Sequence, residues 1–249
     1  MKIISPQQLE EMLAEHRKWL TGKCGKRANL SGIDLSGMNL SKINLYGSYL
    51  IDADLSDANL YKANLSCANL SGANLENADL HNANLSGALL GNAKLYNADL
   101  SGADLSGANL SGADLEYAIL SGANLSGANL GNAKLYNADL SGANLSGADL
   151  EYATLSYAYL SGANLSGANL SGANLYSAQL KSVNLCGADL SGANLTYVDM
   201  HNSDLTDAVL SGTCLAGTIL SGANLSGTDI FLANTNSTDK ISSASISFF

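Results

Sequence analysis

Leucine recurs at every fifth position from residue 30 onward, and this period constrains the fold more than any other feature of the chain. Up to residue 230 only Met200 and Ile230 depart from it, and both are apolar. On an α-helix, with about 3.6 residues per turn, steps of five would spread the leucines around the whole cylinder. On a continuous strand they would alternate between the two faces. The chain can turn every leucine inward only if it bends once per five residues.

The repeating unit reads Ala, then Asn or Asp, then Leu, then two residues that are most often Ser and Gly. Ala and Leu lie two residues apart, so a short extended segment points both side chains to one side. Ser-Gly supplies the bend, because Gly tolerates the positive φ that many tight turns need. Asn77 and Asp207 replace Gly in their units and tolerate this φ next best. Tyr117, Tyr157 and Tyr197 stand at the same position, and there we expect a different corner geometry.

Repeated bending in one sense produces a coil. Its stacked turns bury Leu and Ala, while backbone groups pair with the turns above and below. Each buried leucine contributes about 1.5–3 kcal/mol, whereas ordering the backbone costs about 1–2 kcal/mol per residue. The hydrogen-bond ladder between coils and the packing of Ala must therefore stabilise the fold as well. The expected core includes Leu55, Leu60, Leu65, Leu100, Leu140 and Leu165.

The chain resembles the pentapeptide-repeat family, whose signature is a tandem array of A-[N/D]-L-x-x units like those at 28–230. The resemblance implies an all-β solenoid, a right-handed quadrilateral β-helix with four pentapeptides, or twenty residues, in each coil. The two copies of GNAKLYNADL at 91–100 and 131–140 would then lie two coils apart on the same sides. We expect about ten coils, which at a strand spacing of about 4.7–4.9 Å form a rod roughly 48 Å long.

We divide the chain into an N-terminal capping segment at 1–27, the β-helix at 28–232 and a C-terminal tail at 233–249. A stacked coil has open ladder edges at both ends and aggregates unless they are covered. The tail either seals the last coil or pairs with a second molecule, and Phe248 and Phe249 would suit such a homodimer. The sequence favours neither of these alternatives.

The N-terminal cap is predicted to be a helix over 6–21. Ser5 and Gln8 match a capping box, and Pro6 suits the first helical position. The structural interpretation is a lid on the first coil, and the functional alternative is a helix that binds a partner. The apolar face of this helix consists of Leu9, Met12, Leu13 and Trp19.

Residues that could carry catalysis or bind a metal are few and scattered. His81 and His201 fall on one face but about six coils, roughly 29 Å, apart. The four cysteines lack metal-binding spacing, and we expect free thiols in a reducing compartment. We therefore expect no catalytic activity, no cofactor and no bound metal. The cysteines are Cys24, Cys67, Cys186 and Cys214.

The sequence also lacks membrane and export signals. No stretch approaches the roughly 18 consecutive apolar residues that span a bilayer. The N-terminus has no continuous apolar core of the kind found in secretory signals. We therefore expect no contact with membranes and a cytoplasmic location.

Charge is distributed unevenly along the chain. Residues 1–27 carry six basic and three acidic side chains, 28–230 carry five basic and eighteen acidic ones, and the formal net charge is −10. Such an acidic rod repels nucleic acid, so we expect no direct nucleic-acid binding, and it attracts basic surfaces. The simplest interpretation is that the acidic residues keep a leucine-rich solenoid soluble.

Acidity also suggests a comparison with the quinolone-resistance branch of the family, to which the chain is more distantly similar. Rods of that branch resemble B-DNA and occupy the DNA-binding saddle of gyrase. Here the repeats carry about one net negative charge per 3.7 Å, less than half the DNA density of one per roughly 1.7 Å. Read with a twenty-residue coil, the acidic residues also spread over all four sides, although Asp34 stacks with Asp54 and Asp79 with Asp99.

Tyrosines mark one side of the predicted rod. Six of them are spaced alternately 21 and 19 residues apart, so they zigzag up one side of six consecutive coils, flanked by Lys94 and Lys134. One interpretation is a structural ladder, in which each aromatic pair contributes about 0.5–1.5 kcal/mol. The other is an exposed stripe of the residue type favoured at interfaces. Both stay open. The six are Tyr96, Tyr117, Tyr136, Tyr157, Tyr176 and Tyr197.

The leading hypothesis is a non-enzymatic scaffold that binds an unidentified protein partner through its outer faces or its ends. The alternative is an acidic DNA mimic that binds a type II topoisomerase, gyrase, and protects or inhibits it. A third hypothesis is a flat surface for ice or polysaccharide, which the absence of regular Thr arrays disfavours.

Overall fold

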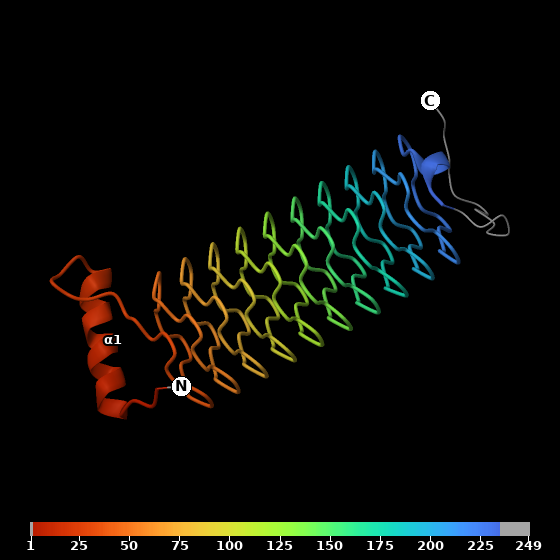
Figure 1. Ribbon diagram of the computed structural model, residues 1–249. Coiled ribbons are helices and arrows are strands. Elements are labelled where there is room, and N and C mark those ends of the chain that lie inside the picture. Colours follow the sequence, from red (N-terminus) through yellow and green to blue (C-terminus); the bar gives the residue numbers. More distant parts are fainter. Residues whose placement is uncertain (1, 235–249) are drawn as a thin grey trace.

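The protein is a rod of stacked coils with a helix lying across its N-terminal end (Figure 1). The structure is a computed structural model and describes residues 2–234. Its helical elements are α1 (Pro6–Leu20) and a short 3₁₀ helix, η1 (Ile230–Leu232). Between them the backbone forms parallel bridges between residues twenty apart, from Asn29 with Tyr49 to Cys214 with Asn234. Each coil of this β-helix therefore contains four pentapeptides.

Backbone hydrogen bonds join each coil to the coil before it and to the coil after it. The N–H of Leu140 donates to the carbonyl oxygen of Tyr159 in the next coil at 2.7 Å. The N–H of Asp139 donates to the carbonyl oxygen of Ala118 in the previous coil at 3.0 Å. Equivalent bonds recur along the repeats, so the backbone groups that face neighbouring coils are paired rather than buried without a partner.

The interior of the rod consists mainly of leucines and alanines. The alanine two residues before each leucine shares its inward direction, and Ala138 and Leu140 are both fully buried. Because these two residue types fill most interior positions, most coils present a similar interior to the next one, with exceptions such as Val183, Met200 and Thr213. The leucines expected in the core have an exposed fraction of 0%, namely Leu55, Leu60, Leu65, Leu100, Leu140 and Leu165.

Each bend is a tight turn whose third residue adopts a left-handed conformation. The N–H of Ala138 donates to the carbonyl oxygen of Leu135 at 3.1 Å and closes one such turn. Between them Asn137 has a φ of 55°, and the equivalent Gly142 has a φ of 65°. Positive φ at this position is what a type II turn requires. The Ser-Gly corners predicted from the sequence are therefore present.

The prediction of a different corner at three tyrosines was wrong. Tyr117, Tyr157 and Tyr197 have φ values of 61°, 61° and 59°, the same left-handed conformation as the glycines. The ladder on both sides of the corner fixes the backbone, whichever residue stands there. A residue with a Cβ pays about 1–2 kcal/mol in this conformation, and the ring contacts of these tyrosines offset that cost.

The Asn or Asp that precedes most leucines stabilises the following bend, a role that the five-residue period alone does not reveal. The Oδ1 atom of Asp139 accepts the N–H of Ser141 at 2.9 Å, and Asn144 accepts that of Ser146 at 3.2 Å. These are Asx turns, in which the side chain stabilises the start of the bend. Asn also links coils, as where Nδ2 of Asn144 donates to Oδ1 of Asn124 at 3.3 Å.

The predicted N-terminal helix is present as α1. The N–H of Gln8 donates to Oγ of Ser5 at 3.2 Å, and the N–H of Ser5 donates to Oε1 of Gln8 at 2.8 Å, which completes the capping box. At the other end Gly22, with a φ of 70°, donates to the Trp19 carbonyl, and Lys23 donates to that of Lys18. This pair of bonds is a Schellman motif. The helix therefore has defined stops at both ends.

Helix α1 packs its apolar face on the open end of the rod. Leu9 is buried in the hydrophobic core, and Met12 and Leu13 pack against that core while partly exposed. Trp19 stacks on His16 with ring centroids 5.4 Å apart and on Tyr46 of the repeats at 6.4 Å. The apolar residues predicted for this helix thus lie between it and the first coil or beside the rod.

The start of the chain pairs with one side of the exposed ladder edge. The N–H of Lys2 donates to the Gly32 carbonyl at 2.8 Å, and the N–H of Asp34 donates to the Lys2 carbonyl at 3.1 Å. Lys2 thus forms a parallel bridge with Ile33. On this side of the first coil the paired edge no longer templates aggregation. At the other end the expected roles of the tail concern residues 235–249, including Phe248 and Phe249, which lie outside the described residues.

His16 is a buried polar residue of α1 that links the N-terminal cap to the repeats. It is fully buried, and its Nδ1 atom accepts the N–H of Ala28, the first residue of the repeats, at 3.1 Å. Burial, and then the positive charge of Arg27, lowers the pKa of His16 below its ordinary value. A protonated Nδ1 cannot accept a hydrogen bond. The neutral imidazole is therefore the form that the folded cap holds.

We expect acidification to destabilise the folded protein through His16. The unfolded chain, with an ordinary pKa of about 6.5, binds the proton first as the pH falls. The contribution of His16 is therefore complete above about pH 6.5 and is lost progressively below it, where carboxylates with pKa values near 4 stay ionised down to about pH 5. Urea unfolding at a series of pH values between 5 and 8 measures this change.

The matched control is His16→Gln, because a Gln oxygen can accept a hydrogen bond without titrating. Its free energy of unfolding should depend less on pH between 5 and 6.5 than that of the wild type. Parallel pH profiles for the two proteins would contradict the role given to His16.

Candidate interaction surface

The six tyrosines predicted to line up do form one continuous column along a corner of the rod. Consecutive rings contact edge to face, with centroids 5.4–5.8 Å apart and interplanar angles of 62–85°. This is an arrangement that aromatic pairs prefer. We call the set from Tyr96 to Tyr197 the tyrosine column. All six predicted residues are brought together.

The column is built by alternating between the two positions of one corner. Tyr96, Tyr136 and Tyr176 occupy the first corner position, which is most often Ser. In the intervening coils the tyrosine stands at the second position, with positive φ, as at Tyr117 and Tyr157. The offset places each ring against the edge or the face of the next one instead of directly above it.

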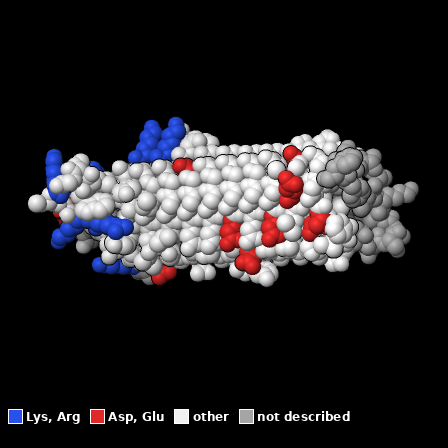
Figure 2. Space-filling view, turned by 90° about the horizontal axis from the view of Figure 1, so that it is seen from above, with Lys and Arg blue, Asp and Glu red and all other residues white. Residues whose placement is uncertain are grey.

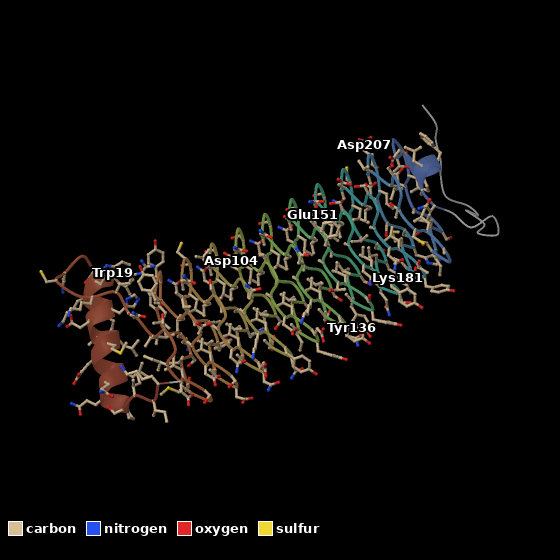
Figure 3. All side chains as sticks on the ribbon, viewed as in Figure 1. Trp19, Asp104, Tyr136, Glu151, Lys181 and Asp207 are labelled. Carbon is tan, nitrogen blue, oxygen red and sulfur yellow. The ribbon has the colours of Figure 1, made fainter. Side chains whose placement is uncertain are left out.

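The rings of the tyrosine column contact one another and also face solvent. In Figure 3 Tyr136 projects from one edge of the rod, opposite the edge that carries Asp207. Tyr136 and Tyr176 are half-buried. The structural and the functional interpretations of the column are thus compatible. The exposed fractions of the other four are 44% for Tyr96, 42% for Tyr117, 43% for Tyr157 and 61% for Tyr197.

The rod face that follows the tyrosine column along the chain carries further exposed apolar side chains. Ile119, Tyr159 and Ile219 are 41%, 44% and 44% exposed, and they replace the usual Asn or Asp before a leucine. Ile119 and Tyr159 both bridge to Asp139, so they lie two coils apart on the same face. Sequence reasoning missed this patch, although a twenty-residue reading of the positions before leucine would have found it.

Charged groups around the tyrosine column are partly paired. Lys134 lies 3.7 Å from Asp114, and Lys181 lies 3.2 Å from Asp199. Burial raises the pKa of Asp199, but hydrogen bonds from His201 and Lys181 outweigh this effect and lower it below its ordinary value. Both lysine side chains are therefore held beside carboxylates and not left free.

Basic residues are concentrated toward the capped end of the rod. Figure 2 shows Lys and Arg gathered toward the capped end and Asp and Glu in separate patches on the visible face. The bridges of Asp34 with Asp54 and of Asp79 with Asp99 place these acidic pairs in neighbouring coils, as the sequence predicted. The visible acidic groups do not form one continuous stripe.

The remaining candidates for chemistry lie apart from one another. His81 stacks on Tyr61 at 5.7 Å and its Nδ1 lies 2.6 Å from Oγ of Ser101, whereas His201 bonds Asp199. The four cysteines are free thiols. Within residues 2–234 no three His, Cys, Asp or Glu side chains are grouped so that they could hold a metal ion. In the same part of the chain, no helix has the length and hydrophobicity needed to cross a bilayer.

Comparison with known proteins identifies the family. The family model for pentapeptide repeats matches the chain in eight copies between residues 28 and 234. The crystal structure of HetL, a pentapeptide repeat protein involved in heterocyst differentiation regulation from the cyanobacterium Nostoc sp. strain PCC 7120, is 36% identical. The match covers 88% of this chain and 92% of HetL, with a TM-score of 0.48. The chain therefore belongs to the pentapeptide-repeat family, which implies a right-handed quadrilateral β-helix.

Two other solved structures are similar over different shares of the chain. Rfr23, a pentapeptide repeat protein from the cyanobacterium Cyanothece 51142, is 39% identical over 39% of this chain and 64% of Rfr23, with a TM-score of 0.35. Full-length QnrB1, a plasmid-mediated fluoroquinolone resistance protein, is 23% identical over 82% and 92%, with a TM-score of 0.43. All three TM-scores are below 0.5, so family membership rests on the family model, which matches most of the chain. No curated protein sequence matches this chain significantly.

Proposed function

We propose that this protein is a non-enzymatic, cytoplasmic scaffold that binds a protein partner along the tyrosine column. The observation that carries the proposal is a continuous row of six contacting tyrosine rings, most of which face solvent. Tyrosine is enriched at interface hot spots, because its rigid ring supplies a large contact area with few rotatable bonds. Rings that already brace one another lose little further freedom when a partner binds.

The adjoining face supports the same proposal. Ile119 and Tyr159 place exposed apolar side chains on the face beside the column, where they alternate from coil to coil with Asp99 and Asp139. Large exposed apolar surface on a protein commonly marks an interaction site. The scattered titratable groups of the described residues offer no arrangement for catalysis, and the net charge of −10 disfavours nucleic acid as the ligand.

The direct test uses substitutions that the repeat itself already contains. Tyr136→Ser together with Tyr157→Asn introduces residues that stand at these two corner positions in other units, and it breaks the column at its centre. Immobilised wild type and variant are compared for capture of proteins from the native host by quantitative mass spectrometry. We expect a partner that the wild type retains and that the variant loses by about tenfold or more, as for hot-spot residues.

The matched control is Tyr61→Ser with Tyr152→Asn, which removes two exposed or half-exposed tyrosines at the same two corner positions but outside the column. Circular dichroism and the melting temperature are measured to check that both variants remain folded. Equal capture of the same partner by all three proteins would rule out the column as the binding site.

A second candidate is an acidic DNA mimic that binds a type II topoisomerase. The net charge of −10 favours it. The interrupted acidic patches on the rod count against it, since duplex DNA carries an uninterrupted charge of one per roughly 1.7 Å.

A gyrase supercoiling assay distinguishes this candidate from the scaffold. Inhibition, or protection from a quinolone, at micromolar protein would support mimicry. Supercoiling and drug sensitivity that do not change on adding the protein would exclude it.

A further inference from the structure

The tyrosines of the column recur at a fixed distance along the rod. This distance limits which peptide conformation can contact all of them in the same way. Equivalent tyrosines, such as Tyr96 and Tyr136, recur every forty residues, and bridged residues are twenty apart, so the pattern repeats every two coils. At a strand spacing of about 4.7–4.9 Å, two coils measure about 9.4–9.8 Å. A bound segment that contacts the column uniformly must repeat its side chains at that distance.

Polyproline II is the regular backbone that meets this requirement. It has three residues per turn and rises about 3.1 Å per residue, so every third side chain recurs after about 9.3 Å. A β-strand repeats its side chains after about 6.6–6.8 Å, and two turns of an α-helix span about 10.8 Å. Along the five coil steps from Tyr96 to Tyr197, only the polyproline II helix stays nearly in phase with the rings.

The chemistry of the column suits the same conformation. A polyproline II helix has no internal hydrogen bonds, so its carbonyl oxygens are free to accept from donors such as tyrosine hydroxyls. Grooves lined by aromatic rings hold proline-rich segments of this kind, whose ordering costs little entropy. The edge-to-face contacts, with interplanar angles near 72° at the centre of the column, leave such rings at an angle to each other.

Charged side chains beside the column determine the charge of the segment that the column can attract. Glu116 precedes Tyr117 at the corner, and Asp99 and Asp139 lie on the adjoining face in bridges with Ile119. Among the described residues these three carboxylates form no ion pair. Lys134 and Lys181 are held by aspartates, and the exposed Lys94 forms no ion pair within residues 2–234, so unpaired carboxylates outnumber unpaired lysines beside the column. The surface therefore attracts a basic segment and repels an acidic one.

From the period and the charge we infer that the tyrosine column binds a proline-rich, basic segment of a partner protein in the polyproline II conformation. The segment lies parallel to the rod axis, with a proline at every third position packed against the exposed rings and Arg or Lys toward the carboxylates. About eight residues, at roughly 3.1 Å each, cover the column. This inference rests on the proposed function and specifies the partner of the same surface.

The test is direct binding of synthetic peptides to the full chain, followed by fluorescence anisotropy. The probe carries proline at every third position, alanine between, and arginine at both ends. A second peptide has the same composition with proline at every fourth position, and a third replaces arginine by glutamate. We expect saturable binding of the first peptide, weakened at least about tenfold by either change.

The two double variants used to test the scaffold serve again here. Tyr136→Ser with Tyr157→Asn should weaken binding of the first peptide by about tenfold or more, and Tyr61→Ser with Tyr152→Asn should leave it unchanged. Equal affinity for the peptides with the two proline spacings, or equal affinity of the column variant, would overturn the inference.

The results also distinguish failure of this inference from failure of the scaffold proposal on which it rests. If the column variant loses its host partner but the wild type binds none of the peptides, the column is an interface for another kind of segment and the inference fails alone. If the column variant keeps the host partner, the scaffold proposal fails. Self-association of the wild type that the column variant abolishes would show that a second copy occupies the column, which also overturns the inference.

Discussion

The fold depends on one coupling, between the burial of a leucine every five residues and the hydrogen bonds that join coils twenty residues apart. Leu140 illustrates both, since its side chain is fully buried while its N–H donates to Tyr159 of the next coil at 2.7 Å. Neither term suffices alone, because a buried leucine contributes about 1.5–3 kcal/mol and each ordered residue costs about 1–2 kcal/mol. Stability therefore accumulates from contacts between neighbouring coils, as in other solenoids.

This coupling leaves the outer surface free to vary. The corners accept Gly, Asn, Asp, Lys, Cys, Ser and Tyr in the same left-handed conformation, because the ladder on either side fixes the backbone. Side chains that would be costly in an isolated turn can then line up from coil to coil. The tyrosine column is the clearest example, with Tyr117 and Tyr157 held in a conformation that L-residues rarely adopt. The regular interior thus sets a fixed spacing for the side chains on the outer surface.

Much of this architecture could be predicted from the sequence. The leucine period predicts the inward bends, Ser5 and Gln8 predict the start of α1, and alternate spacings of 21 and 19 predict the column. Four sides per coil came from the family resemblance, since periodicity alone does not fix the number of bends. The burial of His16 and the pairing of Lys2 with Ile33 were not predictable, because they arise from packing of a segment that has no repeat. The tyrosine corners were misjudged because single-residue propensity ignores the ladder.

Deletion of one pentapeptide, compared with deletion of four residues, tests the central claim most directly. Removing residues 121–125 keeps every later leucine in phase with the bends, whereas removing residues 121–124 shifts all of them. Far-UV circular dichroism with thermal unfolding measures both variants. The account predicts a native-like β spectrum and cooperative unfolding for the five-residue deletion, and a large loss of stability for the four-residue one. Equal effects of the two deletions would show that the five-residue phase does not determine the fold.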